Sequence, residues 1–164
     1  MKRSKVTLLL SLLLVLTLVA VSCAQKPAET PAPAPETPAA EGYKDGVYKA
    51  EQADFSETGW KDFVEVTVEG GKITAVNWDA TNKDDETLMK KKASQDGVYD
   101  MKVAGAQSDW HEQAALVEQY LIEQQDPTKI EYSDEEGHVD TITGVSINVK
   151  GFFELAAQAL EQAK

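Results

Sequence analysis

Two adjacent glycines, Gly70 and Gly71, divide a valine-rich stretch of the chain into two segments. In the first segment, valines recur at every second residue from 64 to 68, as expected for a strand with one buried face. A two-residue β-turn needs positive φ values, which glycine adopts without steric strain. The sequence therefore predicts an antiparallel hairpin in which residues 61–68 pair with residues 72–79.

Counting outward from this turn gives the expected register of the two strands. Val68 faces Ile73, and further from the turn Phe63 faces Trp78. Side chains that face each other across an antiparallel pair lie on the same side of the sheet. The two large aromatic side chains are therefore expected on one face.

The remaining elements are predicted from turn signals and helical periodicity. A first strand is expected from Val47 to about Gln52, after an Asp-Gly turn signal. Helices are expected within 84–93, over 109–125, where Asp109 and Glu112 have the spacing of a capping box, and over 147–162. Strands followed by helices predict an α+β fold, an antiparallel β-sheet with helices packed on one face.

Residues 1–22 have the order of a secretory signal peptide. A basic segment precedes an apolar run of about 16 residues, which is shorter than the roughly 20 residues of a spanning helix. Cys23 follows small residues and is the only cysteine in the chain. Its position resembles the invariant cysteine of the bacterial lipobox, which implies lipidation there by acyl chains such as palmitate. The alternative is an uncleaved membrane anchor in which the cysteine has no role.

Residues 23–42 are rich in proline, alanine and glutamate, and they predict a disordered linker behind the lipidated cysteine. The folded domain is then expected over residues 43–164. This part has 12 lysines, no arginine and 25 acidic residues, a formal charge of −13. Such a field repels polyanions, which excludes nucleic acid as a partner.

Most conventional catalytic and metal sites have no support in the sequence. The two histidines, His111 and His138, are far apart, and no cysteine lies near either one. The acidic runs lack the alternating spacing of a calcium loop. Neither a nucleophile elbow nor a phosphate-binding glycine loop is present. We therefore expect no metal site, and neither hydrolysis nor nucleotide hydrolysis.

One segment combines a glycine with flanking hydroxyl groups just before the last predicted helix. It spans residues 140–146, with the sequence DTITGVS. Free N–H groups at the start of a helix favour an anion such as phosphate. On these residues alone a second interpretation stays open, in which Thr143 or Ser146 is simply the N-cap of the helix.

The same segment resembles the flavinylation motif of FMN-binding domains, Asp-Xaa-Xaa-Ser/Thr-Gly-Ala-Thr, whose last threonine carries FMN through a phosphodiester bond. Asp140, Thr143 and Gly144 match this pattern. Val145 replaces the alanine, and Ser146 replaces the acceptor threonine while keeping a hydroxyl group. The resemblance implies that FMN is the cofactor and that Ser146 is its covalent attachment point.

Other parts of the chain resemble the same family in the same order. Residues 45–48 resemble its Asp-Gly-Xaa-Tyr opening, and residues 64–73 resemble its central hairpin. Residues 59–62 resemble a subgroup of single-domain, membrane-anchored lipoproteins. The resemblance makes Trp60, Trp78 and Trp110 candidates to flank the isoalloxazine ring of the flavin. The alternative for each tryptophan is a place in the core.

The function implied by this resemblance is electron transfer outside the cytoplasm. Related domains occur in Rnf-type complexes, in sodium-pumping quinone reductases and in extracellular electron-transfer lipoproteins, which this chain resembles most. The domain would be held at the extracytoplasmic face of the cell membrane by its lipid anchor, and it would not be an enzyme by itself. The implied partners are the membrane, a flavin transferase and a membrane-bound electron donor. A flavin-free surface lipoprotein that acts as a binding or antigenic module is the alternative, because Val145 and Ser146 depart from the family pattern.

Overall fold

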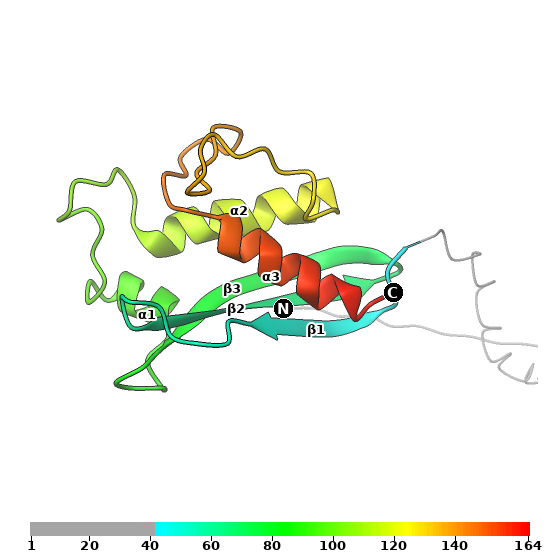
Figure 1. Cartoon of the computed structure of the whole chain (residues 1–164), viewed down its shortest axis with the longest axis horizontal. Coiled ribbons are helices and arrows are strands. Elements are labelled where there is room, and N and C mark those ends of the chain that lie inside the picture. The colour runs from blue at the N-terminus through cyan, green and yellow to red at the C-terminus, as the bar shows by residue number, and fades with distance from the viewer. Residues whose placement is uncertain (1–41) are drawn as a thin grey trace, which may run out of the picture. The chain divides into compact units, whose positions relative to one another are not determined.

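The computed structural model describes residues 42–164, so the predicted signal peptide, Cys23 and nearly all of the linker lie outside the described residues. Figure 1 shows three strands followed by three helices: β1 (Gly46–Glu51), β2 (Trp60–Glu69), β3 (Lys72–Asn82), α1 (Lys90–Gln95), α2 (Trp110–Gln124) and α3 (Lys150–Glu161). The strands form one antiparallel sheet in the order β1-β2-β3, and α2 and α3 cover one face. The predicted α+β fold is confirmed. Within residues 42–164, no helix combines the length and hydropathy needed to cross a bilayer.

The hairpin between β2 and β3 turns at the predicted glycines. The φ angle is 59° at Gly70 and 76° at Gly71, so both turn positions lie in the left-handed region. The Gly71 N–H also donates to Asp45 Oδ1 at 2.9 Å, which links the start of β1 to this turn. The Asp-Gly signal before β1 therefore contributes a side chain to the neighbouring hairpin.

The predicted register is correct only near the turn. Val68 pairs with Ile73 as expected, but a bulge next to Val68 shifts the pairing by one residue. Trp78 consequently pairs with Val64 and not with Phe63, so the predicted pairing of the two aromatics is wrong. Because neighbouring side chains in a strand point to opposite faces, a shift of one residue moves Trp78 into the core and away from the face of Phe63.

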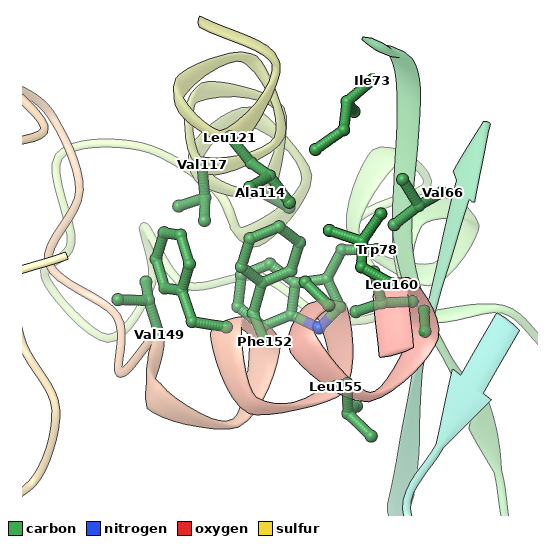
Figure 2. Close-up of a cluster of buried hydrophobic side chains, with 14 of the residues drawn as sticks. Val66, Ile73, Trp78, Ala114, Val117, Leu121, Val149, Phe152, Leu155 and Leu160 are labelled. Carbon is green, nitrogen blue, oxygen red and sulfur yellow. The ribbon is translucent and has the colours of Figure 1, made fainter. Parts of the chain in front are cut away.

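The core lies between the sheet and the two long helices, and Figure 2 shows its central side chains. The ring of Trp78 lies 5.1 Å from Trp110 of α2 and 5.0 Å from Phe152 of α3, measured between centroids. Phe152 also contacts Phe153, with centroids 4.9 Å apart. These aromatic contacts join one strand and both long helices at a single point.

Helix α2 and the residue after it hydrogen-bond two residues at the outer edge of β3. Gln125, just after the helix, accepts the Ile73 N–H and donates to the Ile73 carbonyl oxygen, both at 2.8 Å. Further along the strand, Glu118 accepts the Trp78 N–H at 2.5 Å and binds Lys91 Nζ at 2.6 Å. At Ile73 and Trp78, side chains thus make the hydrogen bonds that a fourth strand would make.

The helix boundaries agree with the prediction for α2 and differ for the other two helices. The capping box at the start of α2 is confirmed, and Glu112 accepts the Asp109 N–H at 2.8 Å. Helix α1 begins only at Lys90, because most of the segment predicted for it forms turns. Helix α3 begins at Lys150, three residues after its predicted start, and its N-cap Val149 offers no side-chain hydrogen bond.

Replacing Gly137 with alanine is expected to lower the free energy of unfolding by about 2–3 kcal/mol, because it adds backbone strain and overpacking. Gly137 has a φ of 95°, and a Cβ there would lie 2.4 Å from Lys150 Cβ. Gly105 is a matched control, because its φ is 93° but no atom of residues 42–164 outside its own neighbours lies within 4 Å of its Cβ position. Urea denaturation should show a loss of about 1 kcal/mol for Gly105→Ala, from the backbone alone. Equal losses in the two variants would contradict a role for the Lys150 contact.

Candidate functional site

The segment 140–146 forms a surface loop against α2. Ile142 is 8% exposed and anchors the loop in the core, and Val145 is half-buried. Gly144 has a φ of 89°, and a Cβ there would lie 3.2 Å from Leu116 Cδ1 of α2. Glycine therefore allows both the positive φ of the turn and the close approach of the loop to α2. The polar side chains of the loop are exposed: Asp140, Thr141, Thr143 and Ser146.

One buried side chain of α2 holds the end of this loop. Gln113 is 1% exposed, and its Oε1 accepts the N–H of Ser146 at 2.7 Å and that of Ile147 at 3.2 Å. Its Nε2 donates to the Ser108 carbonyl oxygen at 3.0 Å. The Ser146 hydroxyl lies 3.3 Å from the same Oε1. The backbone at Ser146 is thereby fixed, while the serine side chain stays exposed.

This geometry corrects the interpretation of the loop as the start of a helix. Because α3 begins at Lys150 with Val149 as its N-cap, neither Thr143 nor Ser146 caps it. The N–H of Ser146 binds Gln113 and is not free to bind a phosphate. The expected anion site at a helix start is therefore wrong at this position, and the loop instead presents an accessible hydroxyl group.

Trp78 lies in the core, where it is 2% exposed, and its Nε1–H donates to Asp62 Oδ2 at 3.2 Å. It also lines a cleft of about 400 Å³ beside the first turn of α3, and it is the only predicted cofactor-site residue in that lining. The cleft begins close to the candidate acceptor, because Asn148 lines it two residues after Ser146. Polar side chains dominate its walls: Gln52, Thr58, Asp62, Lys90, Asn148 and Glu154.

Two of these cleft residues carry opposite charges, and of these Lys90 is buried and Asp62 is half-buried. Lys90 is 9% exposed, and burial lowers the pKa of its ammonium group, although the nearby Asp62 and Asp79 oppose this shift. Burial likewise raises the pKa of Asp62, and the positive charge of Lys90 counteracts part of that effect. In both groups desolvation outweighs the attraction between the charges.

A second group of polar side chains lies in the loop between α2 and α3. Single ligand atoms of Asp134, Glu136 and His138 lie within 4.8 Å of one another. Asp134 accepts the N–H of Gly137 and of His138, at 2.8 and 3.0 Å, and its other oxygen lies 2.6 Å from His138 Nδ1. These hydrogen bonds lower the pKa of Asp134 and explain the arrangement as a local turn.

Sequence reasoning missed Gln113 and Lys90. A signal for Gln113 is present, because it occurs at helical spacing among the apolar residues Trp110, Ala114 and Val117. A polar residue in such a stripe must find buried hydrogen-bond partners. Lys90 has no comparable signal, since it begins a run of three lysines that suggests only a solvated surface.

Replacing Gln113 with leucine is expected to lower the free energy of unfolding by about 2–3 kcal/mol, because the N–H groups of Ser146 and Ile147 lose their acceptor. Gln119→Leu is the matched control, since Gln119 is exposed on the same helix and its side-chain amide hydrogen-bonds only Glu123 among the described residues. That control should change stability by about 0.5 kcal/mol or less. Chemical denaturation measures both, and similar losses would show that Gln113 does not hold the loop.

Comparisons with known proteins agree with one another. Residues 59–161 match the family model described as the FMN-binding domain. A 15 kDa lipoprotein of Treponema pallidum (strain Nichols) is 33% identical over 119 residues, which cover 73% of this chain and 75% of that protein.

Two solved structures are also similar. A solution NMR structure of a Clostridium thermocellum protein has 52% sequence identity and a TM-score of 0.58, with coverage of 74% of this chain and 92% of that one. A crystal structure of a Clostridium perfringens protein has 29% identity and a TM-score of 0.57, with coverage of 74% and 88%. The similarity therefore extends over nearly all of each solved chain.

Proposed function

The chain belongs to the FMN-binding domain family, and on this basis we propose that it is a lipid-anchored, extracytoplasmic electron carrier with FMN esterified to Ser146. The family resemblance of the sequence is confirmed by the family model and the relative. One observation supports the covalent attachment: the Ser146 side chain is exposed, while Gln113 holds its backbone N–H in place.

The residues present fit a phosphodiester at this position. A flavin transferase would use FAD with magnesium, as the family resemblance implies. The bond from Ser146 Oγ to phosphorus would form as the pyrophosphate bond of FAD breaks, with AMP as the leaving group and with release of the hydroxyl proton. The primary hydroxyl of Ser146 supplies the same nucleophilic atom as threonine. Val145 is half-buried beside it and does not cover the exposed serine.

The charge of the domain favours a covalent bond over reversible binding. Residues 43–164 contain no arginine and have a formal charge of −13, which weakens the binding of a phosphate dianion. At a Kd of about 1 µM and an association rate constant of about 10⁶ M⁻¹s⁻¹, FMN would leave within roughly a second. Outside the cytoplasm, released FMN is diluted. A phosphodiester prevents this loss and removes one of the two phosphate charges.

Bound FMN would supply the redox chemistry, accepting and passing on one or two electrons. The protein's own contribution is to fix the attachment point. Gln113 holds the loop backbone, and Gly144 allows the loop to lie against α2. This division of roles describes a carrier whose partners carry out the reactions that supply and consume electrons.

The anchoring proposal rests on the first part of the chain. Cys23 follows a signal-like segment, and the similar Treponema pallidum protein is named a lipoprotein. Acyl chains on Cys23 would hold the domain at the extracytoplasmic face of the cell membrane, since each buried CH₂ contributes about 0.8 kcal/mol. The proposed partners are the membrane, a flavin transferase and a membrane-bound electron donor.

The proposal is tested by intact mass spectrometry of residues 24–164, which include the whole described domain, exported from a host with and without a flavin transferase. We expect a mass gain of one FMN less water only when the transferase is present. Peptide mapping should then place the flavin in the peptide that contains Ser146. A folded, colourless protein of unchanged mass would contradict the covalent carrier and favour a flavin-free binding module.

A further inference from the structure

Lys90 has a largely buried side chain whose ammonium group has no carboxylate partner among residues 42–164. It is 9% exposed, and within the described part of the chain no carboxylate oxygen lies within 4.0 Å of its Nζ. Three aromatic rings surround the ammonium group instead, with centroids 4.6 Å away for Trp110, 5.0 Å for Tyr99 and 5.9 Å for Trp60. Aromatic faces stabilise a cation less than a paired carboxylate does in such a setting.

The two nearest carboxylates are engaged elsewhere. Asp62 accepts the Trp78 indole N–H, and Asp79 accepts the backbone N–H groups of Ala80 and Lys91 at 2.8 and 2.9 Å. Among the described residues no fully buried side-chain nitrogen lacks a hydrogen-bond partner, so the Lys90 ammonium group, which makes no hydrogen bond there, is open to the solvent of the cleft. A perturbed charge of this kind in a cleft is typical of a ligand site.

The cleft that Lys90 lines has the size and position for one particular occupant. Its volume of about 400 Å³ lies within the range of roughly 300–1,000 Å³ that small-molecule sites have. Thr58 and Asn148 supply polar groups that can bind a heterocycle. Asn148 follows Ser146 by two residues, within about 7.6 Å between Cα atoms at 3.8 Å per residue.

We propose that this cleft receives the isoalloxazine ring of the flavin attached to Ser146, and that Lys90 is a positioning residue which favours the reduced ring. The inference rests on the proposed function. Uptake of two electrons and one proton makes the ring one charge more negative, and a fixed cation beside it stabilises that added charge. The same charge contributes less to the neutral, oxidised ring.

The first test compares the midpoint potentials of the FMN-loaded chain and of its Lys90→Met variant, titrated with dithionite. Loss of the cation should disfavour the reduced ring at least tenfold, which is about 30 mV for a two-electron couple. Lys92→Met is the matched control, because the Lys92 side chain is 62% exposed in the same helix and its charge is screened by solvent. A Lys90→Met potential equal to that of Lys92→Met would overturn the proposal.

The second test needs no attached cofactor. The Ser146→Ala chain is titrated with lumiflavin, which contains the ring without the ribityl phosphate, and followed by amide NMR. We expect shifts at Thr58 and Gly151, both of which line the cleft, and at least tenfold weaker binding after Lys90→Met. Shifts confined to another surface, or none, would overturn the proposal.

The two failures can be told apart. If the transferase experiment gives no mass gain, the proposed covalent attachment is wrong. The lumiflavin titration then still shows whether the cleft binds the ring. A mass gain with unchanged potentials and no lumiflavin shifts leaves the carrier intact and removes the role of Lys90. Lys90→Met keeps a side chain of similar size beside the three aromatic rings, and the amide NMR spectrum of the variant shows directly whether it folds.

Discussion

Ser146→Ala is expected to abolish the added FMN mass completely, whereas Ser146→Thr should retain it. Alanine has no atom that can attack phosphorus, and threonine restores the hydroxyl group. The threonine methyl group has room, because Ser146 is exposed. Intact mass spectrometry after expression with a flavin transferase measures both outcomes. The free energy of unfolding should change by about 0.5 kcal/mol or less in each variant, as is usual at exposed positions.

Thr143 is the alternative acceptor residue, because its side chain is also exposed and it precedes Gly144 in the same loop. Thr143→Ala is therefore the control, and it should leave the mass gain unchanged. If the Ser146→Ala variant still gained the FMN mass and the Thr143→Ala variant did not, the acceptor would be Thr143. Gln113→Leu adds a graded result, since a loosened loop should lower the flavinylated fraction without removing the hydroxyl.

Phe152→Ala is expected to lower the free energy of unfolding by about 3–5 kcal/mol, the usual range for a fully buried phenylalanine. Phe152 is 0% exposed and packs against Trp78 and Phe153. Removal of its ring leaves a cavity where α3 meets the sheet. Total stabilities of small domains are about 5–15 kcal/mol, so a loss of this size would leave little margin at 37 °C.

Chemical denaturation followed by tryptophan fluorescence measures this loss, because Trp78 contacts the deleted ring. Phe55→Ala is the control, since Phe55 is 39% exposed in the loop after β1. It should cost about 1 kcal/mol or less, in line with its partial burial. A Phe152→Ala variant as stable as Phe55→Ala would contradict the position of Phe152 at the centre of the core.

The sheet was predictable wherever local signals decide the structure. The paired glycines and alternating valines predict the hairpin, and Asp109 with Glu112 predicts the start of α2, because turns and caps depend on neighbouring residues. The bulge next to Val68 has no such signal. It moved Trp78 to the core face, a position that depends on packing against helices far along the chain.

The candidate site was predictable in part, for the same physical reason. The hydroxyl and glycine of the motif are local features, and the structure shows both at the surface. The support for the loop is not local, because Gln113 precedes Ser146 by 33 residues. Lys90 gains its significance only from three aromatic rings that the fold brings around it. Sequence patterns indicate what a residue can do, and tertiary contacts decide where it does so.

The side-chain hydrogen bonds at the outer edge of β3 affect how one copy of the domain can pair with another. An open strand edge can pair with a strand of another molecule and begin aggregation. Gln125 binds the N–H and the carbonyl oxygen of Ile73, and Glu118 binds the N–H of Trp78. These backbone groups are therefore not free to pair with a strand of a second copy. Two polar side chains therefore close this part of the β3 edge to pairing with a strand of a second copy.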